Sequence, residues 1–111
     1  SQFSSAMALQ APRRLNFRDL PFWILENLRE PLSVNDLAAR VAMSPRNFSR
    51  QFAAEFGITP LRFISQLRVE MALRLLGENN RSRDEVAVEC GFGSLDSLER
   101  ALGRSGIRRR A

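Results

Sequence analysis

The stretch SVNDLAARVAMS (residues 33–44) recurs in altered form as SRDEVAVECGFGS (residues 82–94). In both stretches a serine is followed three positions later by an acidic residue, which is typical of a capped helix N-terminus, and then by an alanine. Met43 matches Phe92, and the second stretch then has one additional residue in its turn, after which Ser44 matches Ser94. The pattern predicts that one two-helix unit occurs twice in this chain.

The residues that follow each stretch continue the match, because Phe48 and Arg50 correspond to Leu98 and Arg100. Each unit has a small alanine where two helices must cross closely, a short turn, and a second helix with apolar residues four positions apart. These are the elements of a helix-turn-helix. The alternative is a pair of unrelated helical hairpins packed into a bundle.

Capping residues, prolines and glycines divide the rest of the chain into helices. Ser44-Pro45 and Thr59-Pro60 each combine a cap with a proline at the first helical position, and Asp19 is expected to cap the first helix. No stretch alternates apolar and polar residues between turn residues, so we expect no strand. We expect helices over residues 19–29, 34–42, 45–56, 60–77, 83–90 and 95–103.

The expected fold is all-α, with two homeodomain-like helix-turn-helix subdomains joined by a long central linker helix. Residues 1–16 lack a hydrophobic period and are rich in Ser, Gln, Ala and Pro, so we expect a disordered linker or a tail left from cloning. The expected division of the remainder is residues 17–59 for the first subdomain, 60–77 for the linker helix and 78–111 for the second subdomain.

Composition excludes several classes of protein. The chain has 111 residues, which fits one domain, and no apolar run approaches the roughly 20 residues that span a membrane, so no membrane partner is expected. It has no His, Tyr or Lys, which removes imidazole catalysis, imidazole metal ligands and Schiff-base chemistry. The one cysteine, Cys90, leaves no intrachain disulfide or cysteine–zinc cluster and is expected to be buried. We expect no enzyme activity, no cofactor and no metal.

The charge balance indicates a polyanionic partner. The basic residues are all arginines, the net charge is +5 and the pI is 11.3. A guanidinium group can donate two hydrogen bonds to a phosphate or a guanine edge, so double-stranded DNA is the partner we expect. A basic surface that balances an acidic partner domain is the alternative. Several arginines are expected to reach phosphates, from among Arg40, Arg46, Arg50, Arg62, Arg68, Arg100 and Arg104.

The second helix of the first unit has two distinct faces. Phe48, Phe52 and Phe56 recur every four residues and predict a ridge that packs into the core. A separate polar stripe begins at the helix N-terminus, which is the end that enters the major groove in a helix-turn-helix. This stripe contains Arg46, Asn47, Ser49 and Arg50.

Four motifs carry a resemblance to a known family: MSPRNFSRQF (residues 43–52), GITP (57–60), RVEMALRLL (68–76) and GFGS (91–94). With them, residues 20–106 closely resemble the AraC/XylS family of bacterial transcription regulators. The run PFWILENLREPLS (21–33) is similar to the GlxA-type branch of that family, in which an amidotransferase-like sensor domain precedes this module.

The resemblance implies a seven-helix, two-lobed DNA-binding domain of a cytoplasmic transcription regulator, an activator for example. Its implied partners are double-stranded DNA, RNA polymerase and the sensor domain of the full-length protein. It also implies DNA-facing residues at matching positions of both units. These are Arg46, Asn47, Ser49 and Arg50 in the first unit, and Leu95, Asp96, Glu99 and Arg100 in the second.

The second unit departs from the family pattern. The family reads F-x-R-x-F in this helix and then S-P-x-x-Y-R, whereas this chain reads Leu98-Glu-Arg100-Ala-Leu102 and ends in RRRA. The final helix is therefore expected to be missing or altered, and the second unit to be the less rigid of the two. The first unit is expected to supply most of the affinity and sequence discrimination.

The length of the linker helix predicts how much DNA one chain covers. About 18 residues at 1.5 Å each span ~27 Å, close to the ~34 Å between successive major grooves, so we expect sequence-specific reading of two such grooves. A nonspecific nucleic-acid binder is one alternative, but it would need aromatic side chains on its surface, and the phenylalanines here have core spacing. A helical protein-interaction module that uses the Phe and Leu surface is the other.

Overall fold

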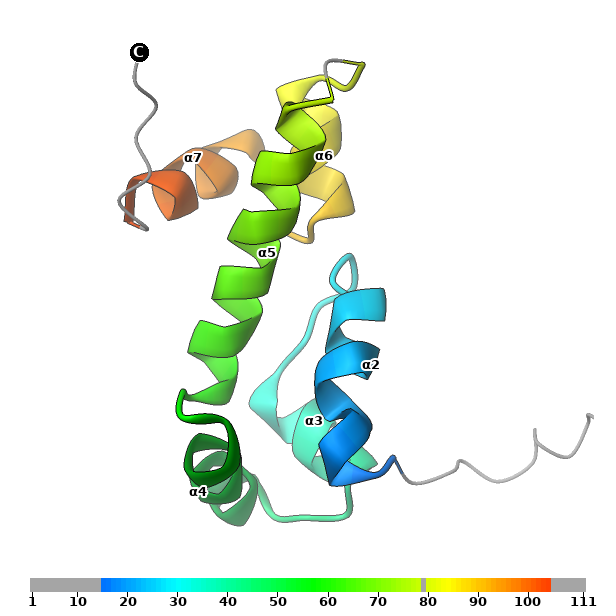
Figure 1. The fold of residues 1–111 in the computed structure, drawn as a ribbon, viewed down its shortest axis with the longest axis vertical. Helices are drawn as coiled ribbons and strands as arrows, with labels where there is room; N and C mark the ends of the chain where they lie inside the picture. Colours follow the sequence, from blue (N-terminus) through cyan, green and yellow to red (C-terminus); the bar gives the residue numbers. More distant parts are fainter. Residues whose placement is uncertain (1–14, 79, 105–111) are drawn as a thin grey trace, which may run out of the picture.

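A computed structural model describes residues 15–78 and 80–104, and within them the chain is all-α, as predicted. A single 3-10 turn, η1 (Phe17–Asp19), precedes the α-helices. The long helix α5 forms a central column, with α2, α3 and α4 around one end and α6 and α7 around the other (Figure 1). The α-helices are α2 (Leu20–Glu26), α3 (Val34–Arg40), α4 (Pro45–Phe56), α5 (Pro60–Leu76), α6 (Arg83–Glu89) and α7 (Leu95–Arg104).

Side-chain caps start the helices at the positions that the sequence predicts. The Ser44 hydroxyl accepts a hydrogen bond from the backbone N–H of Asn47 (3.2 Å), and Pro45 follows as the first residue of α4. Ser82 begins α6 with a complete capping box. Its hydroxyl accepts from the Glu85 N–H (3.1 Å), and the Glu85 carboxylate accepts from the Ser82 N–H (3.0 Å).

Three local expectations at the first helices are wrong. Asp19 makes no side-chain cap, because η1 already holds its backbone in the helical region. The helix expected to reach Arg29 ends at Glu26, because the Asn27 side chain donates to the Trp23 carbonyl (2.8 Å) and the Asn27 backbone turns away. Asp36 does not complete a capping box with Ser33, which caps α3 alone by accepting from the Asp36 N–H.

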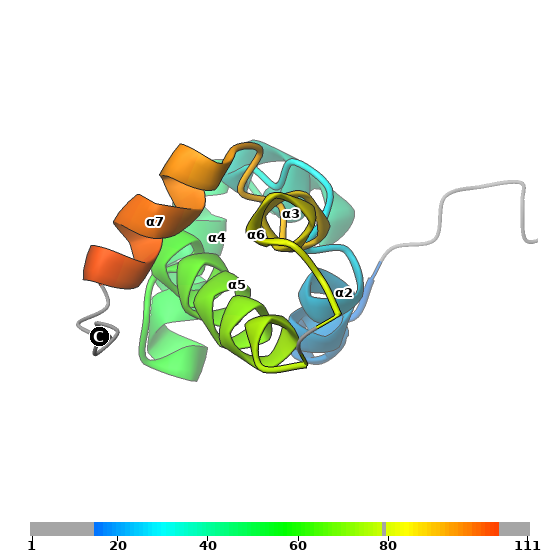
Figure 2. The same cartoon turned by 90° about the horizontal axis from the view of Figure 1, so that it is seen from above.

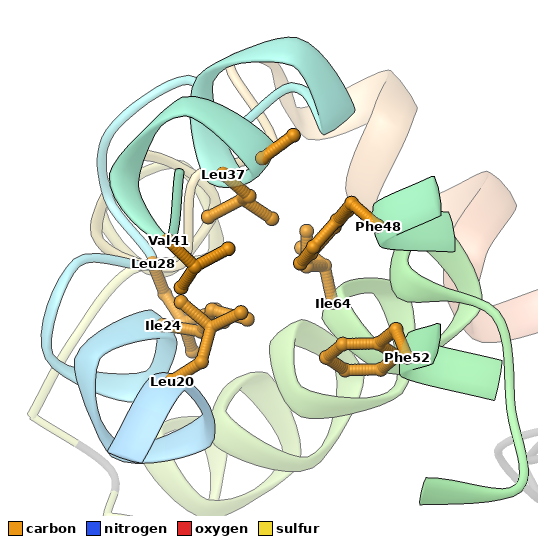
Figure 3. Close-up of a cluster of buried hydrophobic side chains, with 9 residues drawn as sticks. Leu20, Ile24, Leu28, Leu37, Val41, Phe48, Phe52 and Ile64 are labelled. Atoms are coloured by element: carbon orange, nitrogen blue, oxygen red, sulfur yellow. The ribbon is translucent and has the colours of Figure 1, made fainter. Parts of the chain in front are cut away.

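The core of the first lobe gathers apolar side chains from α2, α3, α4 and α5. Figure 3 shows Leu20 and Ile24 of α2 pointing toward Phe48 and Phe52 of α4, with Ile64 of α5 between them. The rings of Phe48 and Phe52 are fully buried, which confirms the predicted apolar ridge. The cluster comprises nine buried residues: Leu20, Ile24, Leu28, Leu37, Ala38, Val41, Phe48, Phe52 and Ile64.

The core of the second lobe is smaller, with five buried residues: Ala72, Val86, Ala87, Cys90 and Leu98. Cys90 is fully buried, as expected from the sequence. This core contains no aromatic ring that is fully buried, whereas two such rings fill the first. The difference leaves less apolar area removed from water in the second lobe, which predicts a lower local stability.

The repeat is present in three dimensions. In the first unit the Met43 N–H donates to the Ala38 carbonyl (2.9 Å), and in the second the Phe92 N–H donates to the Ala87 carbonyl (2.9 Å). Both alanines are buried where the paired helices cross. The residue before each donor has a positive φ, 58° at Ala42 and 85° at Gly91. Two copies of one helix-turn-helix therefore explain the repeated sequence.

Two expectations lie wholly or partly outside the described residues. These are the tail over residues 1–16 and the missing or altered helix after residue 104. Of the expected tail, Leu15 and Asn16 belong to the first lobe, since the Leu15 N–H donates to the Arg40 carbonyl (3.0 Å) and Asn16 caps η1. No helix in residues 15–78 and 80–104 has the length and apolar character needed to cross a membrane.

Candidate nucleic-acid interface

Helix α4 presents an arginine-rich face to solvent. Arg46 and Arg50 are exposed, and Asn47 and Ser49 are half-buried beside them, while the aromatic ridge of the same helix faces the core. The Arg50 guanidinium donates to the Asn47 side-chain carbonyl (3.3 Å). In the described part of the chain neither arginine has a carboxylate partner, so both charges are available to an anion.

Helix α7 carries the matching face of the second unit, and its charges are already paired. The Arg100 guanidinium lies 3.2 Å from the Asp96 carboxylate, one helical turn away. Glu99 pairs with Arg83 of α6 at 2.9 Å. The fourth predicted residue, Leu95, is half-buried and packs against the second core. The two units therefore present faces of different charge, cationic on α4 and nearly neutral on α7.

Two further arginines, Arg62 of α5 and Arg104 at the end of α7, line a groove of about 520 Å³ between these helices. Ser65, Gln66 and Glu70 also line it. The polar residues 62, 65 and 66 lie three and four positions apart on one face of α5, a spacing that could have revealed this surface from the sequence. Both arginines are among the predicted candidates for phosphate contacts, whereas no role is predicted for Ser65 and Gln66.

One of the seven candidate arginines for phosphate contacts is engaged within the protein. The Arg68 side chain is turned into the protein, where its Nη2 donates to the backbone carbonyls of Leu28 (3.0 Å) and Glu30 (2.9 Å). Burial lowers the pKa of this guanidinium. Arg40, another of the predicted contacts, lies over the Trp23 ring with its guanidinium carbon 4.3 Å from the ring centre, an arrangement that attracts a cation to the π face.

The fold brings helices α4 and α7 to one side of the central helix. Helices α4 and α7 lie toward the same side of α5 at its opposite ends, and α2 lies toward the other side (Figures 1 and 2). Helix α5 has 17 residues, so at 1.5 Å per residue it is about 26 Å long. The described residues extend over 50 Å along the longest axis. A helix-turn-helix uses the second helix of its pair to enter the major groove, and α4 and α7 are those helices here.

The family comparison agrees with this geometry. Residues 37–105 match the model of a family described as a helix-turn-helix domain. A solved structure described as an AraC-type DNA-binding domain-containing regulator from Chromobacterium violaceum is 27% identical, with a TM-score of 0.71 over 82% of both chains. The chain belongs to the AraC-type helix-turn-helix family. The resemblance recognised in its motifs is thereby confirmed.

Among solved AraC-type relatives, the DNA-binding domain of the global transcriptional factor AdpA, crystallised in complex with a target DNA, is 41% identical to this chain. The TM-score is 0.76 over 79% of each chain. The HTH-type transcriptional regulator Rv1931c of Mycobacterium tuberculosis is 39% identical over 71 residues, which are 64% of this chain and 27% of that protein. The chain thus spans about a quarter of the length of that curated relative.

The cysteine of this AraC-type domain lies in its interior and takes no part in the DNA-facing surface. Burial, together with the neighbouring Glu89 carboxylate, raises the pKa of the Cys90 thiol to about 11. Because the thiolate is the reactive form, this thiol is neutral and unreactive at physiological pH. Its role is packing in the second core.

Proposed function

We propose that this chain is the DNA-reading module of a transcription regulator and binds double-stranded DNA sequence-specifically, with α4 and α7 in two successive major grooves. The observation that carries the proposal is the placement of both helices on one side of α5, a helix about 26 Å long. Successive major grooves on one face of DNA are about 34 Å apart, which is comparable to the length of this helix.

The residues proposed to read DNA differ between the two units. In the first, Arg46 and Arg50 suit guanine edges and phosphates, and Asn47 and Ser49 can add hydrogen bonds to bases or backbone. In the second, Asp96, Glu99 and Arg100 are engaged in ion pairs, and Leu95 is largely committed to the core. We therefore assign most of the affinity and discrimination to α4, and modest contacts to α7.

The experiment that tests this function is selection of bound duplexes from a random pool, followed by footprinting of the selected site. We expect two protected blocks about one helical turn apart on the same face of the DNA, bound by one chain. A footprint of roughly five base pairs, or a strict requirement for a palindrome, would contradict reading of two grooves. Recovery of no motif at all would instead support the nonspecific binder or the protein-interaction module.

The activity of the whole protein is also a proposal, since relatives of this chain are several times longer. We propose that a sensor domain accompanies the module in a bacterial cytoplasmic regulator and that the regulator contacts RNA polymerase. Transcription in vitro from a promoter that contains the selected site tests the last point. Output that changes when the full-length protein is added supports it, and output that never changes contradicts it.

A further inference from the structure

The two lobes of the molecule meet at a joint in the middle of α5. Arg68 extends from this helix toward the first lobe, where its Nη2 bridges the carbonyls of Leu28 and Glu30, 38 and 40 residues earlier in the chain. These carbonyls belong to the segment that follows α2. Helices α6 and α7 make their main contacts with each other and with α5, so this joint adds a link between the lobes beyond α5 itself.

A glycine of the second lobe completes the joint. A Cβ atom at Gly91 would overlap the Leu28 carbonyl oxygen and would lie 2.8 Å from Nε and 2.9 Å from Nη2 of Arg68. Glycine is therefore required by close approach of the second lobe to the first. The matching residue of the first unit is Ala42, which has the same left-handed conformation and carries a Cβ. The positive φ is thus not by itself the reason for glycine at position 91.

The Arg68 guanidinium is incompletely satisfied in this position. Its Nε is buried without a hydrogen-bond partner among the described residues. A buried donor left unpaired costs free energy, as does the desolvation of the charge. An apolar side chain would avoid both costs. We therefore expect this arginine to orient the two lobes and not only to stabilise the fold. Its planar donors can fix the direction and distance of two carbonyls in the other lobe.

We infer that Arg68 and Gly91 act as positioning residues that set the spacing between α4 and α7, and so the spacing of the two DNA half-sites that one chain accepts. This inference rests on the proposed function. One inserted base pair moves the second half-site by about 3.4 Å along the DNA and about 34° around it. If the joint is rigid, α4 and α7 cannot adjust to the new half-site position, whereas a loose joint allows them to adjust.

The test measures affinity for the selected duplex, for versions with one or two base pairs inserted or deleted between the half-sites, and for a duplex with the first half-site alone. The unaltered chain should bind best at one spacing. Arg68→Met and Gly91→Ala should lower affinity at that spacing about tenfold, through loss of well-placed base contacts, and should flatten the dependence on spacing. Both variants should bind the single half-site as the unaltered chain does.

Each variant has a matched control. Gly93→Ala imposes the same strain, since φ is +84° at Gly93, but a Cβ there meets nothing within 4 Å. Arg74→Met removes an exposed arginine from α5 without touching the joint. Both control variants should bind most tightly at the same half-site spacing as the unaltered chain. Circular dichroism shows whether each variant folds. If Arg68→Met fails to fold, Arg68→Lys takes its place, because it keeps the charge but cannot present two donors in one plane. Its dependence of affinity on half-site spacing should be intermediate.

The possible failures are distinguishable. A sharp optimum that persists in folded Arg68→Met, Arg68→Lys and Gly91→Ala overturns the inference and leaves the proposed function intact. Equal losses on the single half-site and on all spacings also overturn it, because they indicate a general loss of structure. An unaltered chain with no preferred spacing contradicts the reading of two grooves itself.

Discussion

Single side chains decide which of two similar helices presents unpaired positive charge. Arg46 and Arg50 of α4 have no carboxylate partner in the described structure, whereas Arg100 of α7 is paired with Asp96. We therefore expect Arg46→Ala and Arg50→Ala each to weaken binding to the selected site by about 1–3 kcal/mol. Asp96→Ala should cost little or should strengthen nonspecific binding, because it frees a cation. Equilibrium titration of labelled duplex measures both effects.

The matched comparison is Arg100→Ala, which removes an arginine from the equivalent position of the second unit. It should cost less than Arg50→Ala, since part of its charge is already neutralised. The assignment is wrong if Arg100→Ala and Asp96→Ala abolish specific binding while Arg46→Ala and Arg50→Ala leave it intact.

The buried thiol makes stability depend on alkaline pH. The pKa of Cys90 is about 11 in the folded chain and about 8.5 in an unfolded one. Above the lower value the unfolded state ionises first, so the free energy of unfolding should fall between about pH 9 and pH 11. The chain has no Lys or Tyr, so apart from the arginines no other side chain titrates between pH 9 and pH 11. Urea unfolding across this range measures the slope, which Cys90→Ala should flatten. An equal slope in that variant would rule out Cys90 as its cause.

The helices differ in how firmly packing holds them. The first-lobe core has nine buried residues and a chain of ring contacts, with Phe52 4.5 Å from Phe56 and 5.5 Å from Phe63 between ring centres. The second core has five buried residues. We expect amides of α6 and α7 to exchange with solvent faster than those of α3 and α4, because local opening of the smaller core exposes less apolar surface.

Hydrogen exchange read by mass spectrometry checks this order. Phe52→Ala serves as the control, since removal of a fully buried ring costs about 3–5 kcal/mol and should bring α3 and α4 to the exchange rate of the second lobe or above it. Equal protection of both helix pairs in the unaltered chain would contradict the expected difference in rigidity.

The whole molecule should bind DNA with a moderate dependence on salt. Of the seven candidate arginines for phosphate contacts, Arg68 is engaged in the joint, Arg100 is paired and Arg40 lies over the Trp23 ring. The strongest candidates that remain are Arg46, Arg50, Arg62 and Arg104. Four phosphates neutralised predict a slope of log affinity against log salt of about −3.6, from about −0.9 per phosphate. Arg62→Ala should reduce the slope by about 0.9. Affinity independent of salt would contradict binding to the duplex backbone.

Much of the fold follows from local chemistry that the sequence displays. Helix caps and apolar periods involve residues within about four positions of one another, so Ser44, Ser82 and the Phe48–Phe52 spacing predict their helices directly. Because the sequence repeats, the helices of the first unit also predict those of the second. The solvent-facing arginine stripe of α4 follows from the same local pattern, because an amphipathic helix with one apolar ridge leaves its other face to solvent.

The joint and the paired charges depend instead on residues that only folding brings together. Arg68 looks from the sequence like any other exposed arginine, and its carbonyl partners lie 38 and 40 residues away. Glu99 is held in an ion pair by Arg83, which lies 16 residues earlier in the chain. The need for glycine at position 91 arises from the Leu28 carbonyl of the other lobe. Such long-range contacts leave no period or cap in the sequence, because they depend on how whole helices pack around α5.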